Sequence, residues 1–404
     1  MDAFAIKIRY GLIHLVFITV LFFLSSDAPS QRLNLKKIFR DVEQQTDVLI
    51  NSLNKQKKEN IGLMMPRTLE NGKLKLVKSS DWTSGFFPGV LWQIYLYSNK
   101  NFWKARADSF TRLLEEEKFN SRTHDMGFKI FCSYGNAYKA TSEKYYKDVI
   151  VQAANTLTTR FNKKVGAIRS WDHSRDKWDF PVIIDNMMNL ELLFAATKYT
   201  GDSTFYNIAV QHANTTMRNH YRPDMSSYHV IDYDSLTGKV SKRNTHQGYS
   251  HESSWARGQA WGLYGFTMCY EETGLQSYLA QAEAIANYLI HHPKMPRDLI
   301  PYWDFDDPAI PHVSKDASAA AVMASALLRL STFSTKNGYL YKKTANKILY
   351  NLSKYYGSPV GENMGFILLH STGHAPAKSE VDVPLNYADY YYLEGLLRTK
   401  RIVK

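Results

Sequence analysis

The sequence contains few of the residues and motifs on which the most familiar functional sites depend. Only two of its 404 residues are cysteine, Cys132 and Cys269, which excludes a framework of several disulfides and favours two buried free thiols. No phosphate-binding loop, dinucleotide fingerprint, His-Glu-x-x-His helix or Gly-x-Ser-x-Gly turn occurs, and no Cys/His spacing suits zinc. The side chains that remain for chemistry are carboxylates, histidine, tryptophan and arginine.

The first 28 residues predict a secretory signal peptide. Lys7 and Arg9 precede an apolar run from Leu12 to Leu24, and small residues up to Ala28 follow it. This run is short for a membrane-spanning helix. We therefore expect an exported protein, periplasmic or secreted, without stable membrane insertion after cleavage. No stretch rich in Gly, Pro or Ser divides residues 29–404, which predicts a single domain.

The chain is basic, with a formal net charge of +12 to which residues 1–28 contribute nothing. A basic field attracts polyanions, whether nucleic acid, anionic membrane or acidic polysaccharide. The lysines and arginines are scattered without a block of five or more, and together with export this argues against nucleic acid as a partner. An anionic membrane surface and an acidic polysaccharide both stay open as partners at this point.

Two kinds of helical pattern alternate along the chain. One kind is amphipathic and predicts outer helices: Leu35 to Leu53, Phe102 to Leu114, Tyr145 to Phe161, Thr204 to Arg218, Ser277 to Ile290 and Leu340 to Leu352. The other is apolar on nearly all sides and predicts buried helices: Gly89 to Tyr97, Met126 to Ala140, Asn186 to Thr197, Ala256 to Tyr270, Ala317 to Leu330 and Tyr387 to Leu397. Six such alternations predict an all-α toroid of six helical hairpins.

An internal repeat supports the toroid. Tyr146, Phe205 and Tyr278 each stand eight residues before an Ala-Asn pair, as expected of stacked or ring-closed units. Strand content is expected to be minor and confined to loops, with one hairpin formed by Tyr228 to Tyr233 and Gly238 to Lys242.

Short polar signatures stand where the buried helices begin. They are Asp81-Trp82-Thr83-Ser84-Gly85, His124-Asp125-Met126-Gly127, Ile184-Asp185-Asn186-Met187-Met188, Trp255-Ala256-Arg257-Gly258-Gln259-Ala260-Trp261, Lys315-Asp316-Ala317-Ser318 and Asn386-Tyr387-Ala388-Asp389-Tyr390. Polar groups at these positions either cap their helices or face a shared cavity. Six in succession suggest a ring of helix N-termini around one site.

Asp125 and Asp185 are the candidate catalytic pair. Each is also a possible N-cap, a role that contributes roughly 1 kcal/mol. Two carboxylates in one cavity shift each other's pKa, so that one can stay protonated near neutral pH and act as a general acid. Asp316 and Asp389 are expected to be caps rather than catalysts.

The remaining candidates each have two interpretations. A buried Arg257 needs an anion, which is either a bound carboxylate or Asp125 or Asp185. Trp82, Trp171 and Trp261 form either core packing or an aromatic wall for a sugar ring. His229 lies in a long insertion and is either a site residue or an exposed loop residue. The stretch Ser371 to Ser379 is either a sulfate-binding loop or an ordinary surface loop.

Taken together, the signatures resemble those of glycoside hydrolase family 88, the unsaturated glucuronyl hydrolases. The matching pieces are Asp81 to Phe86, His124 to Gly127, Asp185 to Asn189, Trp255 to Trp261, Tyr302-Trp303-Asp304-Phe305, Asp316 to Ala319 and Tyr387 to Tyr391. They occur in family order over nearly the whole mature chain. The resemblance implies an (α/α)6 barrel, which agrees with the six hairpins inferred above.

The resemblance also implies an activity. Family members remove a 4,5-unsaturated uronic acid from the non-reducing end of oligosaccharides made by polysaccharide lyases. An aspartate protonates C4, water adds at C5, and the resulting hemiketal opens. By motif, Asp185 is the expected general acid and base, with Asp125 as its partner. The expected lining residues are His124, Trp82, Trp171, His229, Gln247, Arg257 and Trp261. No metal or organic cofactor is implied.

The predicted substrate is a glycosaminoglycan fragment, because the basic charge suits a sulfated sugar. Two rival functions remain. One is an unsaturated rhamnogalacturonyl hydrolase, with the same ring and chemistry but a pectin substrate. The other is a non-catalytic carbohydrate-binding toroid, which would not need two carboxylates at its mouth.

Overall fold

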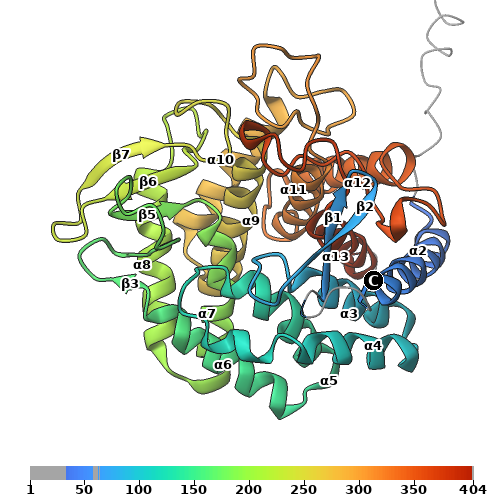
Figure 1. Cartoon of the computed structure of the whole chain (residues 1–404). Coiled ribbons are helices and arrows are strands. Elements are labelled where there is room, and N and C mark those ends of the chain that lie inside the picture. Colours follow the sequence, from blue (N-terminus) through green and yellow to red (C-terminus); the bar gives the residue numbers. More distant parts are fainter. Residues whose placement is uncertain (1–32, 58–61, 63, 403–404) are drawn as a thin grey trace, which may run out of the picture. The chain divides into compact units, whose positions relative to one another are not determined.

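The apolar helices form a closed inner ring in the computed structural model (Figure 1). The structure describes residues 33–57, 62 and 64–402. The ring runs through α3 (Phe86–Ser98), the π-helix η2 (Gly127–Gly135) with its continuation α5 (Asn136–Thr141), α7 (Asn186–Thr200), α9 (Ala256–Thr273), α11 (Ala317–Leu330) and α13 (Asn386–Ile402). Each contacts the next, and α13 closes the ring by packing against α3.

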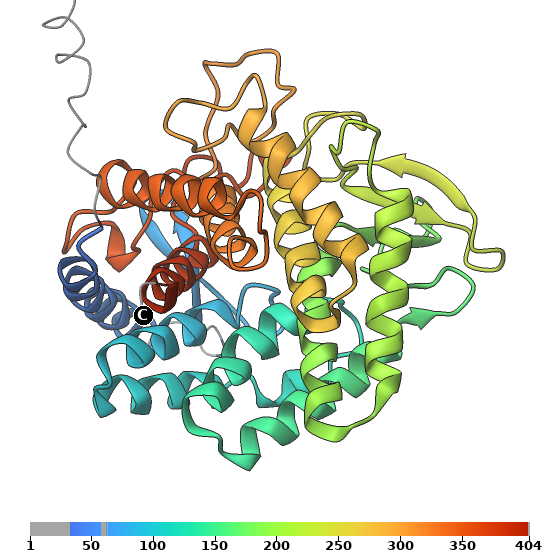
Figure 2. The same ribbon diagram turned by 180° about the vertical axis from the view of Figure 1, so that it is seen from behind.

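The amphipathic helices lie outside this ring, and Figure 2 shows them from behind, with α8 in light green and α10 in gold. They are α2 (Leu35–Lys57), α4 (Asn101–Arg112), α6 (Lys144–Thr158), α8 (Ser203–Asn219), α10 (Gln276–His291) and α12 (Gly338–Tyr355). The repeated aromatics Tyr146, Phe205 and Tyr278 are 1%, 3% and 0% exposed. Burying such a side chain contributes roughly 2–3 kcal/mol, so the repeat fixes outer helices on the ring.

Small residues let the inner helices approach closely. Every residue of α11 is buried, and alanine fills six of its positions. On α9, a Cβ at Gly265 would lie 2.4 Å from the Met187 Cβ, and one at Gly262 would lie 2.0 Å from the Tyr221 hydroxyl. Larger residues there would push α9 away from α7 and the loop that precedes β6.

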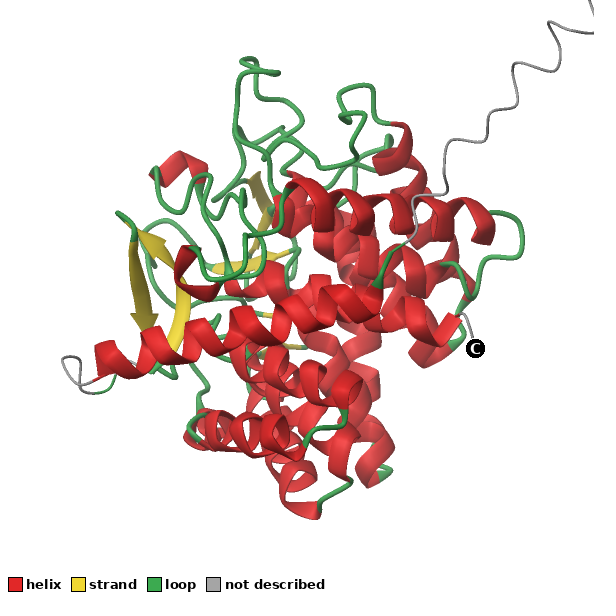
Figure 3. Ribbon diagram, turned by 90° about the vertical axis from the view of Figure 1, so that its right-hand side faces the viewer, coloured by secondary structure: helices red, strands yellow, loops and turns green. Residues whose placement is uncertain are grey.

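The strands and the longest loops gather on one side of the helical ring (Figure 3). The predicted hairpin is confirmed as β6 (Val230–Tyr233) and β7 (Val240–Asn244), which pair antiparallel. The sequence did not indicate the third strand of this sheet, β5 (Phe180–Ile183), whose four residues include a proline. Two further hairpins were also not predicted, β1 (Met65–Glu70) with β2 (Lys73–Val77), and β3 (Phe161–Asn162) with β4 (Ala167–Ile168).

One predicted α-helix, Met126 to Ala140, is instead a π-helix followed by a short α-helix. At its start, the Phe128 N–H donates to Asn189 Oδ1 on α7 at 3.0 Å. A Cβ at Gly127 would lie 2.7 Å from the Asn189 Cα. The tight contact with α7 therefore sets the backbone of this segment, and π-turns of this kind are frequent at functional sites.

Short 3-10 helices occupy loop positions at η1 (Glu115–Phe119), η3 (Asn363–Gly365) and η4 (Ala375–Ala377). Cys132 and Cys269 are buried free thiols, as predicted. Residues Asn34–Lys404 group into one compact unit. The predicted signal peptide and its boundary lie outside the described residues, and no described helix is both long and apolar enough to cross a membrane.

Candidate active site

The starts of the inner helices meet around one cavity of about 400 Å³. Its charged and polar walls come from segments far apart in the chain. The lining residues are Arg67, Trp82, Arg122, Thr123, His124, Asp125, Ser170, Trp171, His173, Ile183, Asp185, His246, Gln247, Arg257, Gly373, His374, Ser379, Glu380 and Tyr387. The suggestion that the polar helix starts share one site is therefore correct for the starts of α3, η2, α7, α9 and α13.

Seven of the nine site residues proposed from the sequence line this cavity: Trp82, His124, Asp125, Trp171, Asp185, Gln247 and Arg257. The other two, His229 and Trp261, lie behind its wall. His229 is 4% exposed and Trp261 is 0% exposed, and neither lines the cavity. The interpretation of His229 as an exposed loop residue is wrong, because the β5–β6–β7 sheet holds its backbone beside α7.

Asp185 stands at the start of α7, yet its side chain does not cap the helix. Its Oδ2 is buried without a hydrogen-bond partner among the residues that the structure describes. Burial raises the pKa of Asp185 to about 7; Arg257 opposes the shift, and Asp125 adds to it. A carboxyl group with that pKa is protonated in about half of the molecules at neutral pH, as a general acid requires.

Asp125 has a different environment from Asp185. The Thr123 hydroxyl donates to its Oδ2 at 2.6 Å, and His124 Nε2 lies 3.2 Å from its Oδ1. Its side chain does not cap η2, whose N-cap residue is Met126. One carboxylate is thus surrounded by hydrogen-bonding groups, while Asp185 has none on its buried oxygen. This asymmetry separates the roles of the two groups.

Unpaired polar atoms gather around the cavity. Among the described residues, buried side-chain atoms without a hydrogen-bond partner include His124 Nδ1, Trp171 Nε1, Asp185 Oδ2, His229 Nε2, Trp261 Nε1 and the Tyr387 hydroxyl. Buried polar atoms in proteins nearly always have partners. Unpaired atoms also occur elsewhere in the barrel, but those of His124, Trp171, Asp185 and Tyr387 belong to the cavity wall, where a polar ligand such as a sugar can pair with them.

The partner of Arg257 differs from those expected from the sequence. It pairs neither with Asp125 nor with Asp185, because its Nη1 lies 2.6 Å from Asp316 Oδ2 in a buried ion pair. The same guanidinium donates to the carbonyl oxygens of Thr372 and Gly373. Arg257 therefore holds the loop over residues 370–382 against the barrel, and it still contributes to the cavity wall.

The two aspartates predicted to be caps differ. Asp316 caps α11 by accepting the Ser318 N–H at 3.0 Å, in addition to pairing with Arg257. Asp389 does not cap α13: it accepts the N–H groups of Ile367 and Leu368 at 3.1 and 2.8 Å. Burial raises the pKa of Asp389 to about 7, although this residue does not line the cavity.

The loop from Ser371 to Ser379 is partly a wall of the cavity. Gly373, His374 and Ser379 line it, whereas Ser371 is fully buried and Lys378 is exposed. Gln247 supports the same loop by donating from Nε2 to the Gly373 carbonyl at 3.0 Å. The surface-loop interpretation therefore fits Lys378 but not the loop as a whole.

Several wall residues were not anticipated from the sequence. Arg67 on β1 donates to both oxygens of Glu380 at 2.5 and 2.9 Å and to Asp81 Oδ2 at 2.8 Å. A buried arginine on a predicted strand would have been the signal, but the β1–β2 hairpin itself was not predicted. Four other cationic or imidazole groups at the mouth were also not predicted: Arg122, His173, His246 and His374.

A model of glycosyl hydrolase family 88 matches residues 57–399. The chain belongs to this family. An unsaturated glucuronyl hydrolase of Formosa agariphila is 47% identical over 397 residues, which is 97% of this chain and 99% of that protein. An unsaturated chondroitin disaccharide hydrolase of Streptococcus pneumoniae is 32% identical over 342 residues, covering 82% of this chain and 85% of the relative.

Solved structures of unsaturated glucuronyl hydrolases have the same fold as this chain. The crystal structure of an unsaturated glucuronyl hydrolase specific for heparin superimposes with a TM-score of 0.84 at 49% identity, covering 90% of this chain and 98% of that one. The enzyme of Bacillus sp. GL1, responsible for glycosaminoglycan degradation, gives 0.81 at 28% identity over 90% of this chain and 97% of its own. The predicted family, the (α/α)6 barrel and the glycoside hydrolase class are confirmed.

Proposed function

We propose that this family 88 chain hydrolyses unsaturated uronic acids from the non-reducing ends of glycosaminoglycan oligosaccharides, by hydration of the C4=C5 double bond. The observation that carries the mechanism is the unlike pair of carboxyl groups in one cavity. Asp185 has a pKa of about 7 because it is buried, and Asp125 keeps a hydrogen-bonded environment. An acid and a stabilising carboxylate are what this hydration needs.

In the first step the Asp185 carboxyl group gives its proton to C4, so the C=C π bond becomes a C–H bond and positive charge develops at C5 and the ring oxygen. The Asp125 carboxylate stabilises that charge. The Asp185 carboxylate then takes a proton from water as the water oxygen bonds to C5. The hemiketal that results opens and releases the second sugar as an alcohol, leaving Asp185 protonated again.

Arginines at the mouth support an anionic substrate, and the imidazoles of His246 and His374, whose pKa values burial lowers, can add hydrogen bonds as neutral groups. Arg67, Arg122, His173, His246 and His374 all line the cavity, and Glu380, the acidic group beside them, is held by Arg67. The net charge of +12 acts in the same direction at longer range. Among glycosaminoglycans, we propose heparin-type fragments, because the heparin-specific enzyme shares 49% identity with this chain.

Loss of the ultraviolet absorbance of the conjugated uronate tests the function directly. We expect turnover of unsaturated disaccharides from heparin, chondroitin and hyaluronan, with the heparin product fastest, and little turnover of the pectin product. Fastest turnover of the pectin product would instead make the enzyme an unsaturated rhamnogalacturonyl hydrolase. Binding without any loss of absorbance would leave the carbohydrate-binding toroid.

We also propose that the enzyme is exported. The basic residues Lys7 and Arg9, the apolar run from Leu12 to Leu24 and the small residues up to Ala28 support this location. N-terminal sequencing of protein recovered outside the cytoplasm is expected to begin near Pro29. An intact N-terminus on all of the protein would contradict the proposal.

A further inference from the structure

The His229 imidazole has one nitrogen whose protonation state is set by the backbone. Its Nδ1 accepts two N–H groups, from His246 at 3.1 Å and from Gln247 at 3.0 Å. A proton on Nδ1 would point at both of these donors, so the nitrogen must be unprotonated. The ring is therefore neutral and carries its single proton on Nε2.

The Nε2 atom of His229 lies close to the proposed general acid. His229 Nε2 is 3.7 Å from Asp185 Oδ2, and neither atom has a hydrogen-bond partner among the described residues. Asp185 Oδ2 is closed to solvent, yet the Asp185 side chain is 11% exposed and lines the cavity. Oδ1 is thus the oxygen of Asp185 that faces the substrate, while Oδ2 faces His229.

We propose that His229 is a positioning residue that fixes which oxygen of Asp185 carries the catalytic proton. An N–H group aimed at Oδ2 disfavours a proton on that oxygen and leaves it on Oδ1, where C4 of the substrate is bound. When the proton moves from Oδ1 to C4, the new carboxylate draws the Nε2–H of His229 onto Oδ2. The proton that water later returns goes to Oδ1. This inference rests on the proposed function.

The surroundings keep His229 neutral throughout this cycle. Burial lowers the pKa of His229 well below its usual value, and the positive charge of Arg257 acts in the same direction. The charged groups that act on the pKa of Asp185 are Arg257 and Asp125, which oppose each other, and the Trp261 indole lowers this pKa as a donor. His229 therefore supplies a fixed N–H dipole, and not a second titrating group.

Two substitutions separate this role from simple packing. In His229→Asn the amide can still accept the backbone N–H groups near the Nδ1 position, but residue 229 no longer supplies a donor to Asp185, and the Trp261 indole is unchanged. In His229→Gln the amide nitrogen can reach the Nε2 position and restore that donor. We expect His229→Asn to lower kcat by about 10- to 100-fold with little change in KM, and His229→Gln to recover part of the loss.

The pH profile gives the sign of the interaction. A donor to the charged form lowers a carboxyl pKa, so its loss in His229→Asn raises the pKa of Asp185 and moves the basic limb of kcat to higher pH. His212→Asn is the matched control: His212 Nδ1 also accepts a backbone N–H, from Ile168 at 3.0 Å, and its buried Nε2 faces no carboxylate. An unmoved limb in His229→Asn, or equal losses in the asparagine and glutamine variants, would overturn the proposal.

A measurement without turnover separates this inference from the proposed function. Long-range 1H–15N spectra of the histidine-labelled full chain are expected to show His229 with an unprotonated Nδ1 and a protonated Nε2 from about pH 5 to about pH 8. A cationic ring, or a proton on Nδ1, would contradict the proposal even if the enzyme is active. Absence of activity on every disaccharide would refute the proposed function and leave the tautomer measurement unaffected.

Discussion

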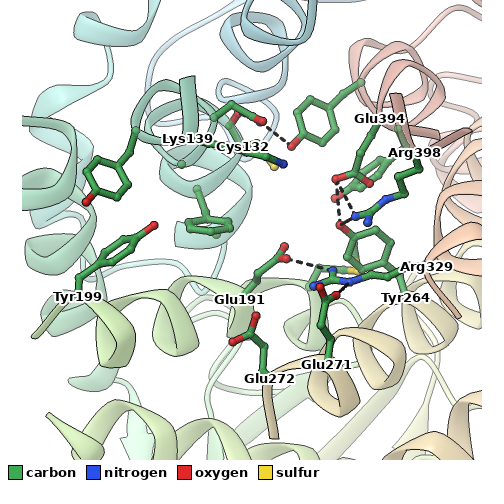
Figure 4. Close-up of a pocket in the computed structure, with 18 of the residues that line it drawn as sticks. Cys132, Lys139, Glu191, Tyr199, Tyr264, Glu271, Glu272, Arg329, Glu394 and Arg398 are labelled. Atoms are coloured by element: carbon green, nitrogen blue, oxygen red, sulfur yellow. Dashed lines mark hydrogen bonds and ion pairs between the residues drawn. The ribbon is translucent and has the colours of Figure 1, made fainter. Parts of the chain in front are cut away.

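The two ends of the barrel hold cavities of the same size, about 400 Å³ each. They differ in whether the polar groups on their walls have hydrogen-bond or ion-pair partners. The second cavity extends from the middle of the inner helices to the C-terminal ends of α7, α9 and α11, and Figure 4 shows the charged residues that line it. There Arg329 pairs with Glu191 at 3.0 Å and with Glu271, and Arg398 Nη2 lies 3.3 Å from Glu394. No lining residue of this cavity has a buried side-chain nitrogen or oxygen atom without a partner among the described residues.

The cavity at the helix starts has such unpartnered atoms in four of its lining residues, His124, Trp171, Asp185 and Tyr387. Cavity volume and charge alone therefore do not distinguish a site from a structural network. Unpaired buried polar atoms on the cavity wall do distinguish them, because a bound polar ligand can supply the missing partners there. The ion pairs around the second cavity hold the inner helices together. The cavity at the helix starts, whose wall has unpaired polar atoms, is the proposed active site.

The sharpest test of this contrast uses two acids on the same helix, Asp185 and Glu191 of α7. Asp185→Asn removes the proton that C4 needs, and we expect kcat to fall on the order of 10³-fold. Glu191→Gln alters the other cavity, and we expect kcat to stay within about twofold of wild type. The absorbance assay measures both. A comparable loss in Glu191→Gln would break the distinction between the two cavities.

The next test concerns stability. Arg329→Met leaves Glu191 and Glu271 without their shared cation, and we expect the free energy of unfolding to fall by about 3 kcal/mol. Urea unfolding followed by circular dichroism measures the loss. The folded fraction is expected to retain wild-type kcat, because Arg329 lines the other cavity only. Unchanged stability would show that the charged network does not brace the barrel.

The smallest expected effect is on the pH dependence. Asp185 acts as an acid, so kcat should fall about tenfold per pH unit as pH rises above its pKa of about 7. The same raised pKa makes the folded state lose stability as pH rises from the unfolded value toward 7. Profiles of kcat for wild type and Glu191→Gln should share this basic limb. If the basic limb of the kcat profile were displaced in Glu191→Gln, the charges at the two ends of the barrel would not be independent.

Most of the helical ring could be predicted from the sequence. A helix buried on all sides is apolar all round, whereas an outer helix is apolar on one face only, so the two kinds have different sequence patterns. The predicted Ala317 to Leu330 agrees with α11, and Thr204 to Arg218 lies one residue inside each end of α8. The π-helix could not be predicted, since it depends on the contact between Gly127 and Asn189, which are distant in sequence. The short strand β5 also depends on its neighbour β6.

The site was less predictable than the fold. The helix-start motifs located Asp125, Asp185 and Arg257 in one cavity, but side-chain partners depend on tertiary distances. Arg257 pairs with Asp316, which lies 59 residues away in the chain, where the sequence offered only Asp125 or Asp185 as partners. The position of His229 behind Asp185 could not be predicted either, because it depends on the β5–β6–β7 sheet.

The direction of the inner helices sets which partial charges meet at each end of the ring. Each helix N-terminus carries a partial charge of about +0.5 and each C-terminus about −0.5. The N-termini of α7, α9 and α13 converge on the proposed site, and the C-terminal ends of α7 and α9 on the other cavity. An anionic group bound beside the N-termini is stabilised by these partial charges, which act within about one helical turn. The opposite end, where carboxylates meet negative helix termini, requires Arg329 and Arg398 to be stable.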